Sequence, residues 1–319
     1  MNFAFTAEQL GFAAAVRDVL RDRCDPSDRL SCWKELAELG LFGALVPEES
    51  GGLGLSLTDL VPAIEETGRA AMPGPVVETL VAGPYAGVVG APRVSLLVDG
   101  LALDADLADL IVDVAGPSIV SVRLEPRRAV DQGRQPFAAT VVDELRVLEA
   151  PAADLVRKAT VGVSAQLIGV ARELLARSVA YAKARTQFGR PIGAFQAVKH
   201  QLADVAIAVE FAAPLVYRAA LSADNAALSA DRAAYSADGK DTGAPVGLSR
   251  PDRDVSAAKV AAGEAAALAA RTALQVHGAI GYTAELDLRF WLARTWSLSA
   301  AYGTTAEHRT RFRQAVFGS

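Results

Sequence analysis

Apolar residues recur at helical spacing in the first and last parts of the chain, and short β-branched runs separate these two parts. In the first part, the spacing predicts three helices, and Thr6 with Gln9 forms a capping-box pattern before the first of them. The third predicted helix begins at Ser56 or Thr58, and two prolines after it end the unit. The pattern therefore predicts a helical domain over residues 1–91.

The middle of the chain, residues 92–150, has the pattern of a small β domain. Its short apolar runs are rich in β-branched residues, which favour strands. Predicted strands lie at Val94–Val98, Leu110–Val114, Ser118–Leu124, Val141–Val142 and Val147–Leu148. A module of this size is near the lower limit for an independent core, so we expect it to pack on its helical neighbours.

Amphipathic helices return in residues 151–319. Four are predicted, from about 152 to 183, from Phe195 through Val209, from Val260 to Leu274, and from Asp287 through Trp296. Long helices with apolar stripes and short links are typical of an antiparallel four-helix bundle. One link is long: Asp238 to Asp254 is rich in Gly, Pro, Asp and Ser, which predicts a mobile loop.

Composition narrows the range of partners. The net charge is −5 and the basic residues are spread along the chain, which argues against a nucleic-acid partner. Cys24 and Cys32 have no histidine near them, so no metal site is predicted; two free thiols are favoured, with a disulfide as the alternative. The first ten residues lack the basic and apolar regions of a secretory signal, and no membrane span is predicted. We therefore expect a cytoplasmic protein.

Two segments carry candidate chemistry. Arg185 to Gly193 forms a Gly- and Pro-containing turn between the first two bundle helices, where a guanidinium suits a diphosphate and Phe188 suits the side of a heterocycle. Gln275 to Thr283 contains glycines that let backbone N–H groups approach a ligand. Taken alone, each segment is explained better as an ordinary turn or helix end.

Together, the two segments resemble the C-terminal signatures of the acyl-CoA dehydrogenase family, an R-x-Q-F-G-x-P-I-x-x-F-Q turn and a Q-x-x-G-G-x-G-Y loop. The stretch from Leu39 to Gly54, with its Val-Pro-Glu-Glu and Gly-Gly-Leu-Gly segments, also resembles the N-terminal domain of that family. The resemblance covers the first ninety or so residues and everything after about residue 150. Three motifs in the right order make it specific.

The resemblance implies a mainly α fold with a helical N-terminal domain, a β middle domain and a C-terminal four-helix bundle. It also implies FAD, an acyl-CoA thioester, and an acceptor such as electron-transfer flavoprotein. In the family, the two C-terminal signatures reach the FAD of the neighbouring chain. The corresponding positions here are Arg185, Gln187, Phe188, Gln196, Gln275, Gly278 and Ala279. Ala279 departs from the family, which has a second glycine there.

The catalytic base of the family is missing at its expected position. The family removes a proton from Cα of the thioester with a Glu in a Y-E-G-T segment, and the matching position here is Tyr302. A phenol with a pKa of ~10 is a poor base at neutral pH. Some members carry the Glu on the first bundle helix, where this chain has Ala159. Glu307 and His308 lie nearby, and we interpret both as part of a solvated helix end.

The middle domain also departs from the family. We find no L-T-E-P-x-A-G-S-D segment, which in the family holds the flavin of its own chain, and the module is shorter than the full barrel. A chain that has lost these features resembles the short subunit of α2β2 acyl-CoA dehydrogenases in bacterial steroid catabolism. A longer partner subunit would then supply the base and hold the shared FAD. The alternatives are a self-sufficient enzyme with Tyr302, Glu307 or His308 as base, and a flavin-free structural protein.

Overall fold

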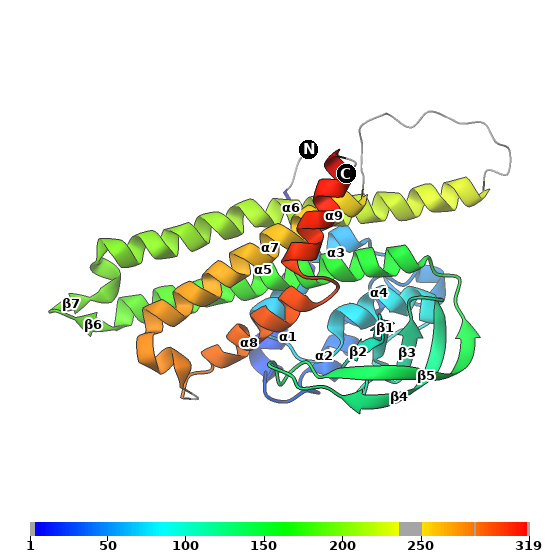
Figure 1. Ribbon diagram of the computed structural model, residues 1–319, viewed down its shortest axis with the longest axis horizontal. Helices are drawn as coiled ribbons and strands as arrows, with labels where there is room; N and C mark the ends of the chain where they lie inside the picture. The colour runs from blue at the N-terminus through cyan, green and yellow to red at the C-terminus, as the bar shows by residue number, and fades with distance from the viewer. Residues whose placement is uncertain (1–3, 236–250, 284, 318–319) are drawn as a thin grey trace.

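Three long helices form the centre of the protein (Figure 1). The computed structural model describes residues 4–235, 251–283 and 285–317, and α5 (Ala152–Ala184), α6 (Gln196–Tyr235) and α7 (Pro251–His277) run antiparallel through it. Alanine is the most frequent residue on the buried face of α7. Their small side chains let α5 and α6 approach α7 closely, because the distance between packed helices depends on the side chains at the contact.

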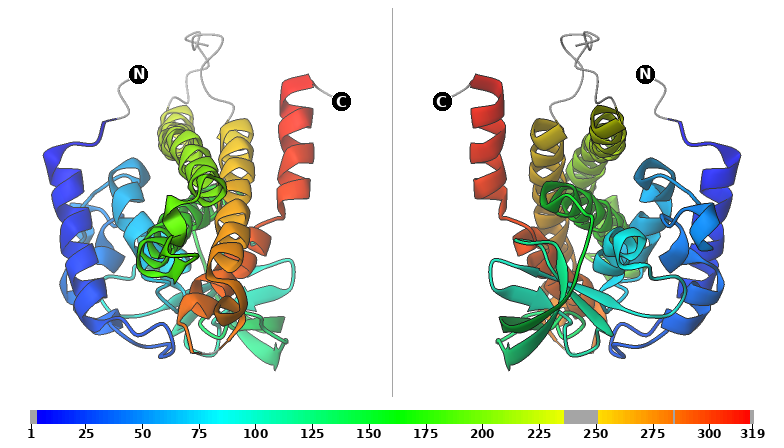
Figure 2. Two further views of the ribbon diagram at one scale, coloured as in Figure 1. Left: turned by 90° about the vertical axis from the view of Figure 1, so that its left-hand side faces the viewer. Right: turned by 90° about the vertical axis from the view of Figure 1, so that its right-hand side faces the viewer.

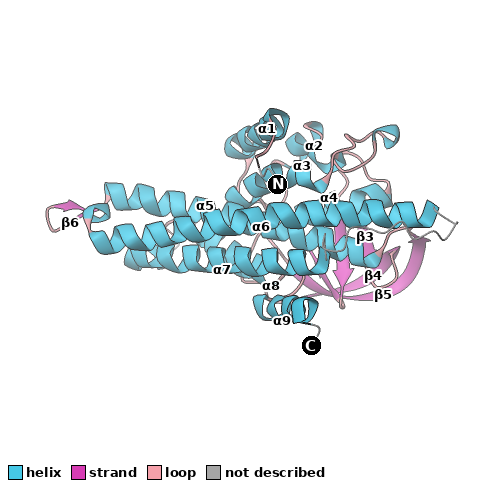
Figure 3. Cartoon of the chain, turned by 90° about the horizontal axis from the view of Figure 1, so that it is seen from above, coloured by secondary structure: helices cyan, strands magenta, loops and turns pink. Residues whose placement is uncertain are grey.

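The N-terminal helices cover one side of these long helices (Figure 3). They are α1 (Ala7–Arg23), α2 (Trp33–Glu38), α3 (Leu57–Arg69) and α4 (Val76–Ala86), with short 3₁₀ turns η1 (Leu41–Gly43) and η2 (Glu48–Ser50). α3 packs on α5 and α6, and α1 packs on α3. Glycines make the contact between α3 and α5 close: a Cβ at Gly169 would overlap the carbonyl oxygen of Glu65.

The capping predictions for this domain are largely confirmed. Thr6 and Gln9 form a capping box at α1, and Ser56, rather than Thr58, forms one with Asp59 at α3. α4 was not predicted, because the prolines before it were interpreted as the end of the helical unit. Pro75 is instead the N-cap residue of α4. Proline fits the start of a helix as well as the region after its end, because its missing N–H is not needed in the first turn.

The middle of the chain forms a small closed barrel with strand order β1-β2-β5-β4-β3. The strands are β1 (Val94–Val98), β2 (Leu101–Leu103), β3 (Leu110–Asp113), β4 (Ser118–Pro126) and β5 (Pro136–Val147). β1 and β3 pair in parallel and the other neighbours pair antiparallel. Val94, Leu96 and Val112 join the main core of the protein, which confirms the expected packing on the helices. β2 was not predicted, and the two runs expected near residues 141 and 147 are parts of one long strand.

The C-terminal region is helical, as predicted, with one helix more than expected. α8 (Leu288–Ala300) packs on α5 and α7, and α9 (Thr305–Phe317) packs on α7. Figure 2 shows α1 and α9 on opposite sides of the molecule, with the barrel below them. The segment from 236 to 250 lies outside the described residues, so most of the predicted loop is untested. The loop prediction was wrong at its end, because Pro251 to Asp254 already belong to α7.

Two helices, Ala152–Ala184 and Gln196–Ala226, are long and apolar enough to cross a membrane by length and composition. In α5, 78% of the most apolar window is buried inside the protein, so its apolarity is that of a core helix. In α6 the buried share is 44%, and Ile207 and Phe211 lie exposed on its outer face. α6 therefore has an apolar side that the rest of the described chain does not cover.

Candidate functional site

The turn between α5 and α6 projects from one end of the bundle (Figure 1). It is a hairpin of β6 (Thr186–Gln187) and β7 (Arg190–Pro191), followed by the 3₁₀ turn η3 (Ile192–Ala194). Phe188 and Gly189 form the tip with positive φ angles of 50° and 77°. Phe188 is 91% exposed, and its ring lies edge-to-face with the Phe195 ring at a centroid distance of 6.1 Å. A large apolar side chain is thus held away from the protein.

The second candidate segment lies at the same end of the bundle. It begins where α7 ends, and continues as the 3₁₀ helix η4 (Gly278–Tyr282). The His277 ring stacks on the Tyr181 ring of α5 at 4.3 Å, which ties the end of α7 to the helix that leads into the hairpin. Gly278 takes a positive φ of 64°, which a glycine adopts without strain. We call residues 185–196 and 275–282 the bundle end.

All seven predicted cofactor contacts are exposed residues of the bundle end. They are Arg185, Gln187, Phe188, Gln196, Gln275, Gly278 and Ala279. Among the described residues, the side chains of Arg185, Gln187, Gln196 and Gln275 have no hydrogen-bond partner. The methyl group of Ala279 is exposed, so it does not disturb the chain's own packing. A guanidinium, three amides and an aromatic ring therefore face outward, where they suit a planar, anionic ligand held by another molecule.

Tyr302, the predicted base position, lies in a different setting. Part of the residue reaches the surface, but its hydroxyl donates inward to Glu78 Oε1 at 2.8 Å. Arg134 donates to the same oxygen at 2.8 Å, and Glu78 and Arg134 are 1% and 3% exposed. Burial, and then the negative charge of Glu78, raise the pKa of Tyr302 well above 10. This phenol is therefore protonated at neutral pH and acts as a hydrogen-bond donor.

A second ion pair extends this arrangement. Arg294 of α8 pairs with Asp131 through its Nε and donates from Nη1 to the backbone oxygen of Met72. Both charged residues are buried. The β4–β5 loop supplies Asp131 and Arg134, so it is bound to the N-terminal helices on one side and to α8 on the other. We call Glu78, Asp131, Arg134, Arg294 and Tyr302 the buried network.

Packing around this loop leaves little free space. A Cβ placed on Gly133 would lie 2.5 Å from Nη2 of Arg294 and 3.2 Å from Cβ of Pro73. The pKa of Arg134 stays above its ordinary value: burial opposes the charge, but the carboxylates of Glu78 and Asp104 outweigh it. The region beside the Tyr302 hydroxyl is therefore filled by the chain's own paired charges.

The structure also places the other candidate base positions, Glu307, His308 and Ala159. Glu307 is exposed at the start of α9, as predicted, and it accepts from Thr304 N–H at 2.7 Å. His308 was predicted to be solvated, and this was wrong: it is 2% exposed, its Nε2 lies 3.0 Å from the backbone oxygen of Tyr302, and its Nδ1 lies 3.2 Å from Ser256 Oγ. Burial lowers the pKa of His308 to about 4. Ala159 is fully buried in the core.

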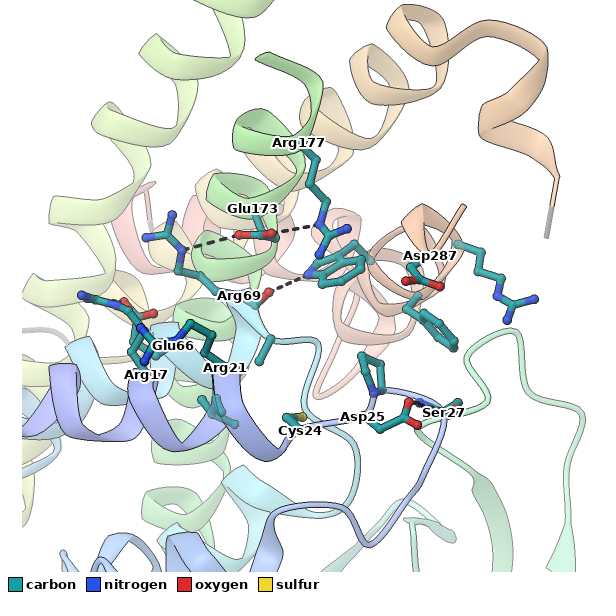
Figure 4. Close-up of a pocket in the computed structure, with 16 residues that line it drawn as sticks. Arg17, Arg21, Cys24, Asp25, Ser27, Glu66, Arg69, Glu173, Arg177 and Asp287 are labelled. Atoms are coloured by element: carbon teal, nitrogen blue, oxygen red, sulfur yellow. Dashed lines mark hydrogen bonds and ion pairs between the residues drawn. The ribbon is translucent and has the colours of Figure 1, made fainter. Parts of the chain in front are cut away.

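A cavity of about 910 Å³ lies between α1, α3, α5 and α8 (Figure 4). Its charged lining consists of Arg17, Arg21, Asp25, Glu66, Arg69, Glu173, Arg177, Asp287 and Arg289. The Arg177 guanidinium stacks 3.7 Å from the Trp291 ring, and the Trp291 N–H donates to Arg69 O at 2.7 Å. A lining of this kind does not suit an acyl chain or another large apolar group.

The cavity and the buried network were not predicted from the sequence. Glu78 offered one usable signal, because it is a single charge within the apolar run Val76–Val81. An isolated carboxylate in such a run requires a partner when it is buried. The identity of that partner, Arg134, depends on how the barrel loop folds back, which no local pattern reveals.

Models of two protein domains match the chain in the expected order. The acyl-CoA dehydrogenase C-terminal domain matches residues 157–317, and the acyl-CoA dehydrogenase N-terminal domain matches residues 5–88. The chain belongs to the acyl-CoA dehydrogenase family. The predicted family and the predicted fold, with its reduced β middle domain, are confirmed.

Individual relatives agree with this assignment. Acyl-CoA dehydrogenase IpdE2 of Mycolicibacterium smegmatis is 27% identical over 307 residues, which cover 89% of this chain and 88% of IpdE2. The ChsE4-ChsE5 complex from Mycobacterium tuberculosis contains a chain that matches with a TM-score of 0.78, at 20% identity and 99% coverage of both chains. The Tcur3481-Tcur3483 steroid ACAD matches with a TM-score of 0.74, at 23% identity and 97% coverage of both. These two structures show similarity of fold.

Acyl-CoA dehydrogenases bind FAD, and the two candidate regions of this chain differ in how well they fit it. The bundle end fits a flavin held from outside, because the side chains of Arg185, Gln187, Gln196 and Gln275 are exposed and lack hydrogen-bond partners among the described residues, and the Phe188 ring is exposed beside them. The surroundings of the Tyr302 hydroxyl do not fit a substrate beside a flavin, because Glu78 and Arg134 already occupy them. The bundle end therefore fits an FAD held by another molecule, whereas the region around the Tyr302 hydroxyl does not fit a substrate beside that FAD.

Proposed function

We propose that this protein is a non-catalytic subunit of a heteromeric acyl-CoA dehydrogenase in the cytoplasm. A longer acyl-CoA dehydrogenase subunit supplies the catalytic base and grips the FAD, in an α2β2 heterotetramer. The bundle end of the present chain contributes further contacts to that FAD. The observation that carries the proposal is the contrast between the hydroxyl of Tyr302, committed to Glu78, and the exposed bundle end.

The chemistry of the family explains why the Tyr302 setting matters. The base must take a proton from Cα of the thioester, while FAD, when bound, accepts the hydride. A base needs both a free lone pair near neutral pH and access to the substrate. Tyr302 has a raised pKa and its hydroxyl donates to Glu78. Neither condition is met, which supports a base in the partner chain and opposes a self-sufficient enzyme with Tyr302 as base.

The bundle end is suited to a binding role. Arg185 presents a guanidinium that would pair with the diphosphate of FAD, and Phe188 presents a ring that would lie beside a planar heterocycle. Gln187, Gln196 and Gln275 add amide donors and acceptors, and the turn at Gly278 and Ala279 exposes backbone to an approaching ligand. These residues would position the cofactor and take no part in proton transfer.

The substrate we propose is a bulky acyl-CoA thioester of the steroid type. The fold similarity to a steroid ACAD and to the ChsE4-ChsE5 complex supports this choice, as does the likeness to IpdE2. The large cavity of this chain is lined by charged residues, so the apolar rings would bind in the partner chain. Electron-transfer flavoprotein, or a similar acceptor, would reoxidise the enzyme.

Flavin counting tests the proposal. We expect the chain purified alone to carry almost no FAD and to lack acyl-CoA dehydrogenase activity. Co-expressed with its longer partner, it should form a yellow, active complex with one FAD for every two chains, measured by absorbance and native mass spectrometry. Stoichiometric FAD and turnover in the isolated chain would contradict the proposal. If Arg185→Ala leaves the flavin content of the complex unchanged, the result would favour a structural role for this chain without contacts to flavin.

A further inference from the structure

The only two cysteines of the chain lie together in space beside the charged cavity. Cys24 ends α1 and Cys32 precedes α2, and both are free thiols. The backbone N–H of Asp25 donates to Ser31 Oγ at 2.7 Å, which closes the loop just inside the two cysteines. Cys32 belongs to the main hydrophobic core, and Cys24 packs against the same core. A short loop closed in this way keeps its two ends near each other, as an intramolecular disulfide between Cys24 and Cys32 requires.

The two thiols differ in access and in chemistry. Cys24 is partly exposed and lines the cavity, as Figure 4 shows, whereas Cys32 is 6% exposed and lies in the core. Hydrogen bonding from Cys32 lowers the pKa of the Cys24 thiol; burial opposes this change, and the Ser31 hydroxyl and the charge of Arg294 add to it. The pKa of Cys32 is raised, chiefly by Cys24. Cys24 is thus the better nucleophile of the pair, because the thiolate is the reactive form.

The backbone at Cys32 adds a separate observation. Its φ of 53° is in the left-handed region, which a non-glycine residue adopts only when its surroundings hold it there. Trp33 follows directly and stacks on Phe42 at 3.9 Å, so the residue next to Cys32 is firmly packed. The surroundings therefore hold Cys32 in one position behind Cys24.

We propose that Cys24 and Cys32 form a site of reversible oxidation by hydroperoxides, with Cys24 as the attacking thiol and Cys32 as the resolving thiol. The Cys24 thiolate attacks one peroxide oxygen, the O–O bond breaks, and the leaving hydroxide takes a proton to become water. The resulting sulfenic acid is attacked by the Cys32 sulfur, which forms the S–S bond and releases a second water. Two thiols lose two electrons and one hydrogen peroxide becomes two waters.

The site is independent of the proposed flavin role. Its cysteines lie in the N-terminal domain and at the cavity, and none of the seven bundle-end residues lines that cavity. Oxidation would join the end of α1 to the start of α2 by a covalent bond. In a reducing cytosol such a bond would be transient and would report oxidative stress.

The test uses the full-length chain, reduced and then freed of reductant. The folded protein is treated with hydrogen peroxide and then unfolded in urea so that both thiols are accessible; free thiols are blocked with N-ethylmaleimide, and the intact mass is measured. We expect the number of maleimides to fall from two to zero and to return to two after reduction. Two maleimides after peroxide in the folded protein, or a disulfide between two chains on a non-reducing gel, would overturn the proposal.

Matched variants assign the two roles. In Cys32→Ser, the sulfenic acid at Cys24 has no resolving thiol, so dimedone should label Cys24. In Cys24→Ser, the remaining thiol is buried, so dimedone should label it only after unfolding. Ser31→Ala removes the hydroxyl oxygen that accepts from Asp25 N–H and closes the loop, so it should slow the oxidation of the otherwise unchanged cysteine pair several-fold. Equal dimedone labelling of the two cysteine variants, with circular dichroism showing both folded, would refute the division of roles.

Discussion

The bundle end and the buried network differ in the exposure and pairing of their polar side chains. At the bundle end, Arg185 and Gln275 are exposed and their side chains find no partner among the described residues. In the buried network, Glu78 accepts from both Arg134 and Tyr302, and Arg294 pairs with Asp131. A polar group left unpaired on the surface costs little, whereas one left unpaired in the interior costs several kcal/mol.

This difference indicates that the bundle end serves binding and that the buried network serves the stability of the fold. Residues of the bundle end are available to another molecule, and their removal should leave the fold intact. Residues of the buried network are committed to one another, and their removal should affect the fold first. The position where the family carries its base belongs to the second group, which is why we place the chemistry in a partner chain.

The largest expected effect comes from Glu78→Ala. This change leaves the buried Arg134 guanidinium without its carboxylate and the Tyr302 hydroxyl without its acceptor. We expect the free energy of unfolding to fall by about 3–5 kcal/mol, measured by urea denaturation. Tyr302→Phe is the matched control: it removes one hydrogen bond and should cost about 1 kcal/mol. A loss below that of the control would show that Glu78 is not the centre of the network.

The next effect concerns the bundle end. Arg185→Ala should weaken FAD binding by the heteromeric complex about 10- to 100-fold, because it removes charge-assisted hydrogen bonds to an anionic ligand. Flavin fluorescence titration measures the affinity. The stability of the isolated chain should change by less than about 0.5 kcal/mol.

Arg190→Ala provides the control for Arg185. Arg190 lies in the same hairpin and is exposed, but its guanidinium stacks 4.2 Å from the Phe195 ring of its own chain. We expect its loss to leave FAD affinity nearly unchanged. Equal losses in both variants would mean that the hairpin acts through its general positive charge rather than through Arg185.

The sequence predicted the exposed region better than the buried one. The bundle-end residues lie in two continuous segments, so a local motif identifies them, and helical periodicity places both segments at helix ends. The buried network combines residues from α4, the β4–β5 loop, α8 and the turn before α9. Only tertiary folding brings Glu78 within 2.8 Å of Tyr302, 224 positions away. α4 was not predicted for a similar reason, because local sequence rules interpret the prolines before it as the end of a helical unit.

Gly133→Ala should give a smaller loss of stability than Glu78→Ala. The added methyl group would meet Nη2 of Arg294, and Arg294 cannot move away easily because Asp131 and Met72 hold it. We expect the free energy of unfolding to fall by about 1–3 kcal/mol. Gly116→Ala is the control, because a Cβ there meets nothing within 4 Å. Similar effects of both substitutions would mean that the loop around Gly133 is loosely packed.

The smallest effect is a pH dependence centred on His308. Burial, followed by the charges of Lys259 and Arg311, lowers the pKa of His308 to about 4, and its contact with the Tyr302 oxygen only partly offsets this. Between pH 6.5 and 4 the unfolded chain therefore binds a proton that the folded chain does not. The contribution of His308 to the free energy of unfolding is fully present above pH 6.5. It is lost as the pH falls towards 4, which lowers the free energy of unfolding by about 1–2 kcal/mol after allowance for solvent screening.

His308→Gln should flatten that part of the stability profile, because glutamine does not titrate. Urea denaturation at pH 7.0 and 4.5 measures the difference, and His200→Gln is the control, since His200 is exposed at the start of α6. An unchanged slope in His308→Gln would mean that His308 is protonated in the folded protein. The added proton would then lie on Nδ1 beside Ser256 Oγ, because Nε2–H already donates to the Tyr302 carbonyl in the neutral ring. The region beside the base position would then hold a positive charge.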